Sequence, residues 1–496
     1  MYKKLFISCI LLSTSFLFFF PVSLKALEIH IVYTNDIHDH IRPGYNGQGG
    51  MPYIAGFVKG LKEKTRNILV VDAGDLTDKG DMVADYTNGE LMFVSLEKIG
   101  YDVVTLGNHD LDKGLDRLCK LKDFASSVNI VTTNWKKGVE KCFNSWSILE
   151  IGGYKIGFIG IVKLEGSEEK VISESLESVN TALNELKERG CNFVIALSHL
   201  SSKSCLELSK RFPDIDLFVS GHTHELLRKA KVCEDTGAIV VQAGMYGLWI
   251  GVLKLLVDTD NGKVLNYENN IVDLKHSEIQ PDLEFLKWVV EKEKEICPIA
   301  SKYLIENKRE LNSSEVAMLA CRALLLKSKA DVALFHPRLL VRSTLPMGKL
   351  DYNAIYMTAG HRAKEIGVVV LKGRDIEEYM ENLVKYGWGR TMWDGFKGLY
   401  IRTFPLNEVE FRSDLDLDRA YKVVVSKREW EGRLKRSLIK SGYKEENLPE
   451  FKLCSFTYFD AVAEFIENIS DDGKTLDDYL NLNAVSVQIK EEVEEP

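Results

Sequence analysis

The segment that decides the fold is Val103-Val104-Thr105-Leu106-Gly107-Asn108-His109-Asp110-Leu111-Asp112. Its first half is apolar and rich in β-branched residues, which predicts a buried parallel strand. Gly107 is expected to let the chain turn sharply there. Ligands and catalytic groups of α/β proteins lie at the carboxyl ends of such strands, so Asn108, His109 and Asp112 are candidate site residues. Alternatively, the polar turn only caps the next helix.

Four other apolar segments end in polar motifs of a similar kind. They end in Asp36-Ile37-His38, Gly74-Asp75, Ser198-His199 and Gly221-His222-Thr223-His224. Strand-like and helix-like segments alternate between them, which is typical of an α/β fold with a covered sheet. Because the carboxyl ends of the strands in an α/β sheet lie at one edge, we expect these motifs to converge.

The shared chemistry of the five motifs is metal ligation. Neutral imidazole and carboxylate oxygen suit Zn, Mn, Co or Fe. The candidate ligands are Asp36, His38, Asp75, Asn108, His199, His222 and His224. This set exceeds the need of one four-coordinate ion. The motifs together therefore predict two divalent ions, about 3.5–4 Å apart, with one carboxylate as bridge, for which Asp75 is the candidate.

Each motif has a plainer explanation when it is taken alone. Asn108 is a common turn residue, and His199 after Ser198 resembles a buried core histidine. The set becomes convincing because each member follows an apolar strand.

His109 and Asp112 are the candidate catalytic residues. His109 lies next to the predicted ligand Asn108, where it would donate a proton to the leaving oxygen or stabilise a pentavalent phosphate. Asp112 is near enough in the sequence to orient the imidazole ring. The remaining carboxylate, Asp110, has no catalytic part in this hypothesis.

Length and charge restrict the classes of function. The chain has 496 residues and 45% hydrophobic residues, which is enough for two or three domains. Its formal net charge of −9 makes nucleic acid an unexpected partner. A charged helix near 281–300 is the expected boundary between an N-terminal and a C-terminal part.

Residues 1–26 resemble a secretory signal peptide. Lys3 and Lys4 precede the apolar run Leu5–Phe20, and Ala26 is a candidate last residue before cleavage. A retained membrane anchor is the alternative. Export to a periplasmic or extracellular compartment is expected, with no membrane contact after cleavage. Nine cysteines are present, eight of them after residue 26, and this even number permits disulfides.

The motifs at the five strand ends resemble those of the calcineurin-like metallophosphoesterases. The opening Thr34–His38 and Asp112 resemble the secreted 5′-nucleotidase group within that family. The resemblance implies a four-layer α/β metallophosphatase sandwich at 27–280, a linking helix at 281–300 and a mixed α/β substrate domain at 301–496.

The resemblance also implies an assignment of the ligands. One ion would be held by Asp36, His38, Asp75 and His224, and the other by Asp75, Asn108, His199 and His222. His109 and Asp112 would match the family's catalytic dyad, and Asn108 would also contact substrate.

The C-terminal half resembles the family more faintly. The segment Arg342–Tyr352 is similar to a family segment that begins with an arginine, so Arg342 is a candidate phosphate contact. The Gly-rich run before that arginine is replaced by Pro337–Val341. The two aromatic segments that stack a nucleotide base are absent. Substitutes such as Trp388 or Trp430 are more simply explained as core residues.

The sequence thus predicts an exported hydrolase with two divalent ions and a small phosphate ester, most simply a nucleotide, as substrate. A thiosulfohydrolase of the same architecture, which acts on a sulfur ester of a carrier protein, is the second hypothesis. A binding protein without catalysis is the third.

Overall fold

The computed structural model describes residues 26–483 with several gaps. The gaps are 46, 137–141, 163–175, 261, 275–277, 336–339, 360–364, 386–391, 395–399, 402–410 and 413–414. The predicted signal peptide therefore lies, except for Ala26, outside the described residues. Among the residues described, no helix combines the length and apolarity that a membrane crossing requires.

The deciding segment forms a short buried strand within a six-stranded sheet. The strands of this sheet are β12 (Lys263–Asp273), β11 (Trp249–Asp258), β1 (Ala26–Thr34), β2 (Ile68–Asp72), β3 (Val103–Thr105) and β4 (Asn129–Val131), in spatial order. The four strands from β1 to β4 are parallel, and β11 and β12 pair antiparallel at one side. The predicted buried parallel strand is confirmed.

A second six-stranded sheet holds the other two ligand motifs. Its spatial order is β5 (Trp146–Ile151), β6 (Tyr154–Val162), β7 (Phe193–His199), β8 (Leu217–Ser220), β10 (Ile239–Val241) and β9 (Lys231–Val232). The strands β6, β7, β8 and β10 are parallel. The sequence led us to expect a single sheet edge, but the five motifs come from two sheets.

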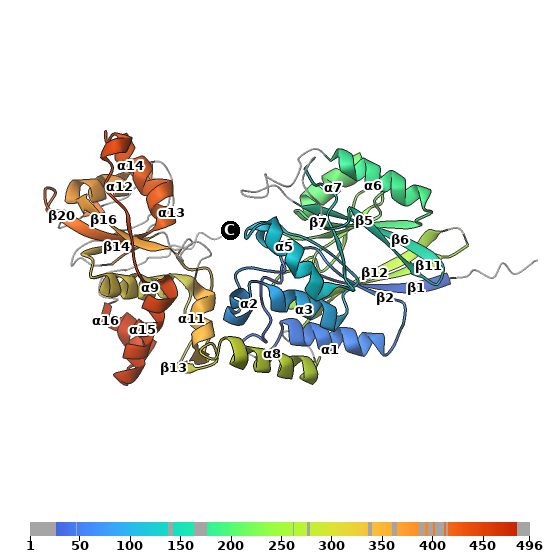
Figure 1. Cartoon of the computed structure of the whole chain (residues 1–496), viewed down its shortest axis with the longest axis horizontal. Coiled ribbons are helices and arrows are strands. Elements are labelled where there is room, and N and C mark those ends of the chain that lie inside the picture. Colours follow the sequence, from blue (N-terminus) through green and yellow to red (C-terminus); the bar gives the residue numbers. More distant parts are fainter. Residues whose placement is uncertain are drawn as a thin grey trace, which may run out of the picture.

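The two sheets pack face to face and helices cover both outer faces, so four layers result (Figure 1). Tyr33 of β1 and Phe158 of β6 both lie in the apolar core between the sheets. The helices on the outer face of the first sheet include α1 (Met51–Lys62), α3 (Glu90–Ile99) and α5 (Leu115–Leu121), and α6 (Glu177–Glu188) and α7 (Ser202–Arg211) cover the second. The α/β sandwich is confirmed.

The charged segment near 281–300 forms helix α8 (Leu283–Ile296). Asp282 caps it by accepting hydrogen bonds from the backbone N–H groups of Glu284 and Phe285, each at 2.9 Å. Phe285 and Val289 pack into the same core as α1. The helix is therefore fastened to the first part of the chain, while the division at 281–300 stays a prediction.

The later residues build a five-stranded sheet between helices. Its spatial order is β17 (Met392–Asp394), β14 (Val332–Phe335), β20 (Ala420–Ser426), β16 (Ile366–Lys372) and β21 (Lys452–Leu453). One face packs against α9 (Ser313–Ser328) and α15 (Tyr458–Asp471), and the other against α12 (Gly373–Lys385) and α14 (Lys435–Lys440). Smaller elements are β13 (Tyr303–Asn307), β15 (Gly348–Asp351), β18 (Tyr400–Ile401), β19 (Phe411–Arg412), α13 (Lys427–Glu429) and α16 (Leu476–Asn483).

Polar contacts join the two parts beside the ligand motifs. Asp351 accepts hydrogen bonds from Arg42 Nη2 at 2.8 Å and from the Tyr45 hydroxyl at 2.7 Å. Asn353, in α11 (Tyr352–Thr358), bonds to Asp81 at 2.8 Å, just before α2 (Met82–Tyr86). These contacts hold the loop that carries Arg342 against the first part of the chain.

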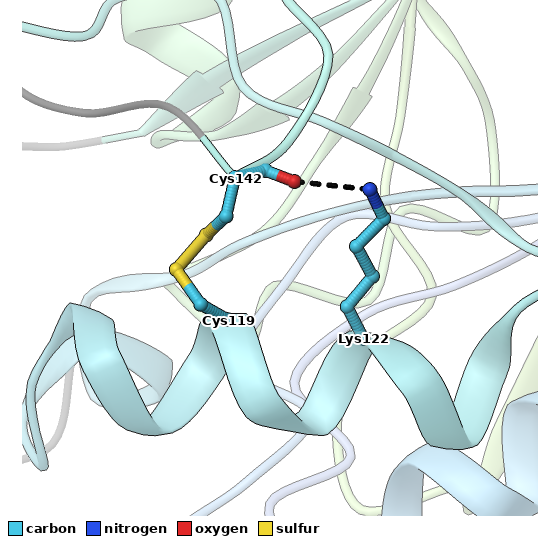
Figure 2. Close-up of a disulfide and its surroundings, with 3 residues drawn as sticks. All are labelled: Cys119, Lys122 and Cys142. Carbon is cyan, nitrogen blue, oxygen red and sulfur yellow. Dashed lines mark hydrogen bonds between the residues drawn. A yellow bond between two sulfur atoms is a disulfide. The ribbon is translucent and has the colours of Figure 1, made fainter.

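A disulfide joins Cys119 of α5 to Cys142, 23 residues later (Figure 2). Lys122 also donates a hydrogen bond to the Cys142 carbonyl oxygen at 3.2 Å. This bridge ties the segment after β4 to the outer helix.

We expect the disulfide to stabilise the fold measurably. Replacing Cys119 and Cys142 together by alanine should lower the free energy of unfolding by about 2–4 kcal/mol, because the open chain regains loop entropy. Urea unfolding with and without a reductant measures this. The reductant should destabilise the wild type and leave the variant unchanged; equal stability of the two proteins without reductant would contradict the expectation.

Candidate active site

The structure brings all seven predicted ligands to one place, where the two sheets meet. Asp36 follows β1, Asp75 follows β2 and Asn108 begins the short helix α4 (Asn108–Leu111) after β3. His199 is the last residue of β7, and His222 and His224 follow β8. The buried ligand side chains are those of Asp36, His38, Asp75, Asn108 and His199.

The first group of ligand atoms contains Asp36, His38 and His224. Asp36 Oδ1 lies 3.8 Å from His38 Nε2 and 3.4 Å from His224 Nε2. The two histidine Nε2 atoms are 3.2 Å apart. Three donor atoms therefore face a common point.

The second group is centred on Asp75. Its Oδ2 lies 3.7 Å from His38 Nε2 and 3.1 Å from His199 Nε2, and Asp36 Oδ1 of the first group also lies 3.9 Å from His199 Nε2, so both carboxylates border the two groups. Nearby, Asn108 Oδ1 and His222 Nδ1 are 3.0 Å apart. This placement suits a carboxylate that is shared by two ions.

These donors fit divalent ions. Ligand atoms that lie 2.0–2.2 Å from a tetrahedral ion are roughly 3.3–3.6 Å from one another, which resembles the spacing of both groups. His199 donates from Nδ1 to the Ala73 carbonyl oxygen at 2.9 Å, and its buried Nε2 faces Asp75 Oδ2 at 3.1 Å. The ring is thus oriented by its backbone contact and presents Nε2 to the site.

The backbone at the ligands is strained. Asp36, His38, Asp75, His222 and His224 all have φ between 52° and 71°, a left-handed conformation that costs energy in residues other than glycine. Such strain persists only where the surrounding fold enforces it. It turns successive side chains toward the space between the sheets.

Gly107 has a different role from the expected sharp turn. Its backbone is extended, with φ −106° and ψ 178°, so the turn does not require glycine. A Cβ atom at this position would lie 2.1 Å from Asp75 Oδ1. Glycine is needed because β3 passes very close to the Asp75 side chain.

We expect Gly107→Ala to displace Asp75 and to lower activity by roughly 10²-fold, as small misplacements of positioned groups do. Bound metal should fall as well, and elemental analysis beside a hydrolysis assay measures both. Gly60→Ala is the matched control, because that glycine of α1 has no positive φ and a Cβ there would meet nothing within 4 Å. Wild-type activity of the Gly107 variant would contradict the close approach.

Charge is concentrated at Asp75 and His199. Burial acts to raise the pKa of Asp75, but His199, His38 and His109 outweigh it and hold the pKa well below its usual range. Burial acts to lower the pKa of His199, but Asp75 and Asp36 raise it to about 10. The Asp75 carboxylate therefore stays ionised and ready for a cation.

The structure places the two residues of the candidate dyad in contact. His109 Nδ1 lies 2.8 Å from Asp112 Oδ2, and the His109 backbone N–H donates to Asp75 Oδ1 at 2.8 Å. Asp110 serves the fold instead, since its carboxylate accepts hydrogen bonds from Gly107 N and Thr77 N, each at 2.9 Å. The alternative of a helix-capping turn is therefore also correct, for Asp110.

Sequence reasoning missed Lys79, whose Nζ lies 2.5 Å from His109 Nε2. The only sequence signal was its place four residues after Asp75, in the same loop. Arg342 and Lys79 both line a cavity of about 290 Å³ between the two parts of the chain, together with aromatic rings of Tyr86, Tyr356 and Phe459.

Of the two proposed aromatic substitutes, Trp430 lies within the described residues and does not line this cavity. Trp430 is buried and stacks on Phe451 with the ring centroids 6.2 Å apart, so it belongs to the core. Trp388 lies outside the described residues. The cavity's aromatic rings were not singled out by the sequence.

Comparison with known proteins agrees with this architecture. Two solved structures share the fold across both parts of the chain. A 5′-nucleotidase precursor of Thermus thermophilus has a TM-score of 0.70 at 20% identity and covers 89% of this chain and 97% of its own. The sulfate thiohydrolase SoxB of Thermus thermophilus has a TM-score of 0.65 at 17% identity and covers 90% and 94%.

Curated relatives are matched over about half of their own length or less. Endonuclease YhcR of Bacillus subtilis is 25% identical over 404 residues, which are 71% of this chain and 32% of that protein. A 5′-nucleotidase of Diplobatis ommata is 25% identical over 303 residues, 53% of this chain and 52% of that protein. Residues 29–226, which contain every predicted metal ligand, match the family model of calcineurin-like phosphoesterases.

Proposed function

We propose that the chain is an exported phosphoesterase that uses two divalent ions to hydrolyse small phosphate esters, nucleotides above all. The convergence of seven donor side chains from five strand ends, with Asp36 and Asp75 both bordering the two groups, carries the proposal. A relative and a fold neighbour that are named 5′-nucleotidases support the choice of nucleotides.

In this proposal the ligand residues form two ion sites. Asp36, His38, Asp75 and His224 hold one ion, and Asp75, Asn108, His199 and His222 hold the other. Ions bound there lower the pKa of water and neutralise phosphate oxygens.

The dyad and Arg342 act on the substrate. His109, oriented by Asp112, assists the departure of the leaving oxygen, and Arg342 contacts the phosphate across the cavity. The identity of the ions is open among Zn, Mn, Co and Fe.

The disulfide supports export. Disulfides persist in oxidising compartments such as the periplasm or the extracellular space. A periplasmic or extracellular location, without membrane contact once residues 1–26 are removed, follows as part of the proposal.

A thiosulfohydrolase remains the second candidate. The SoxB structure shares the fold across both parts of the chain, and the base-stacking segments are absent from this sequence. A protein without catalysis is less consistent with a complete and converging set of ligands.

A substrate panel tests these candidates. Nucleotides, UDP-sugars, cyclic nucleotides, a thiosulfate-conjugated peptide and single-stranded DNA are offered with added Mn or Zn. We expect phosphate release from nucleotides that a chelator abolishes and metal restores. DNA should be a poor substrate at a net charge of −9; metal-loaded protein that releases no phosphate would refute the proposal.

A further inference from the structure

Lys79 faces the substrate cavity from the loop that follows the Asp75 ligand. It lines the cavity together with Arg342, which belongs to the other part of the chain. Arg342 has a buried Nη1 without a hydrogen-bond partner among the residues described. Two cationic side chains, one from each part of the chain, therefore line the same cavity beside the candidate catalytic centre.

Of the three described acidic residues that border the cavity, Asp85 and Asp460 bind other groups, and Asp78 has its Oδ2 3.5 Å from His109 Nδ1. Asp85 pairs with Lys113 Nζ at 2.6 Å and accepts a hydrogen bond from the Tyr356 hydroxyl. Asp460 accepts hydrogen bonds from the backbone N–H and the hydroxyl of Thr457, both at 2.8 Å. The charges of Lys79 and Arg342 are thus the ones that an anionic ligand would meet.

The fold holds Lys79 in a strained position. Asp78 and Lys79 have φ of 80° and 77°, and such conformations persist where the fold enforces them. The Asp78 backbone N–H donates to Asp39 Oδ2 at 2.6 Å, and a Cβ on Gly80 would lie 2.2 Å from the His38 carbonyl oxygen. The loop is therefore pressed against the first ligand motif.

The contact with His109 defines the side of the substrate that Lys79 would meet. Asp112 Oδ2 lies 2.8 Å from Nδ1 of His109, and Lys79 Nζ lies 2.5 Å from Nε2 on the other side of the ring. In the proposed function His109 Nε2 faces the leaving oxygen. Lys79 then stands beside the leaving group.

We propose that Lys79 is a specificity-determining residue that binds a negatively charged leaving group, so that the enzyme prefers phosphoanhydrides to simple monoesters. The proposal rests on the proposed function. The water oxygen bonds to the terminal phosphorus, and the bridging P–O bond breaks with its electron pair left on the departing phosphate. The protons of the water go to orthophosphate and solvent. A monoester leaves as a neutral alcohol and gains nothing from Lys79.

The test compares ADP with AMP as substrates of metal-loaded wild type and Lys79→Met. We expect kcat/KM for ADP to fall roughly 10- to 100-fold, as for a lost hydrogen bond to a charged group, and kcat/KM for AMP to fall less than about threefold. Lys79→Arg should restore most of the ADP activity. Lys64→Met, at an exposed position on the outer surface, is the matched control and should equal wild type.

Binding gives a second readout. Calorimetry with the non-hydrolysable methylene analogue of ADP should show weaker binding to Lys79→Met and unchanged metal content. Equal losses with ADP and AMP, or no loss with either, would overturn the role of Lys79. Wild type that hydrolyses neither compound would instead refute the proposed function.

Discussion

Replacement of Asp75 by alanine is expected to abolish phosphate-ester hydrolysis and to release metal at the same time. Asp75 Oδ2 lies within 3.7 Å of His38 Nε2 and 3.1 Å of His199 Nε2, so the carboxylate borders both groups of ligand atoms. Loss of a shared carboxylate weakens both ion sites together, and activity should fall by a factor on the order of 10³ or more.

Metal content and hydrolysis should be measured on the same preparation. Elemental analysis is expected to show that both ions are depleted in Asp75→Ala, while circular dichroism shows a folded chain. Asp116→Ala, an exposed carboxylate on α5, is the matched control. A variant that retains both ions and full activity would show that Asp75 is not the shared ligand.

The sequence sufficed for these ligands because each one directly follows a strand. An apolar run that stops at a polar motif locates the end of the strand and the ligand in one step, as at β7 and His199. What it did not show is that the strands belong to two sheets. Which sheet a strand joins depends on which apolar faces pack together. A fully buried strand has apolar side chains on both faces, so its sequence does not distinguish them.

Strands and helices without a clear apolar pattern were not predicted from the sequence. β12 (Lys263–Asp273) is an edge strand whose side chains are mostly exposed, so it lacks a clear alternation. Helix α7 (Ser202–Arg211) is predominantly polar. Asn312 caps α9 by accepting hydrogen bonds from the backbone N–H groups of Ser314 and Glu315.

The role of Lys79 could not be predicted from a sequence pattern. It belongs to no predicted element, and its relation to His109 arises from the folding of one loop over another. Arg342 was found only through resemblance, and its position opposite Lys79 depends on contacts such as Asn353 with Asp81. Residues that meet across two parts of a chain leave no local signal.

Replacement of His109 by alanine should separate catalysis from metal binding. Its Nδ1 pairs with Asp112 Oδ2 at 2.8 Å, and its side chain belongs to neither proposed ion site. We expect kcat to fall by about 10²–10⁴-fold, the usual contribution of a positioned acid or base. Asp112→Asn should cost less, about 10–100-fold, because it disturbs only the orientation of the ring.

The metal content of the variant distinguishes this loss of activity from the loss in Asp75→Ala. His109→Ala should keep both ions and should bind a substrate analogue, because the donors at Asp36, His38 and His199 are untouched. A substrate whose leaving group needs no protonation, such as p-nitrophenyl phosphate, should recover much of the lost rate, since the acid is then dispensable. An equal deficit with this substrate would instead make His109 a stabiliser of the phosphate in the transition state, and a loss of metal would place it among the ligands.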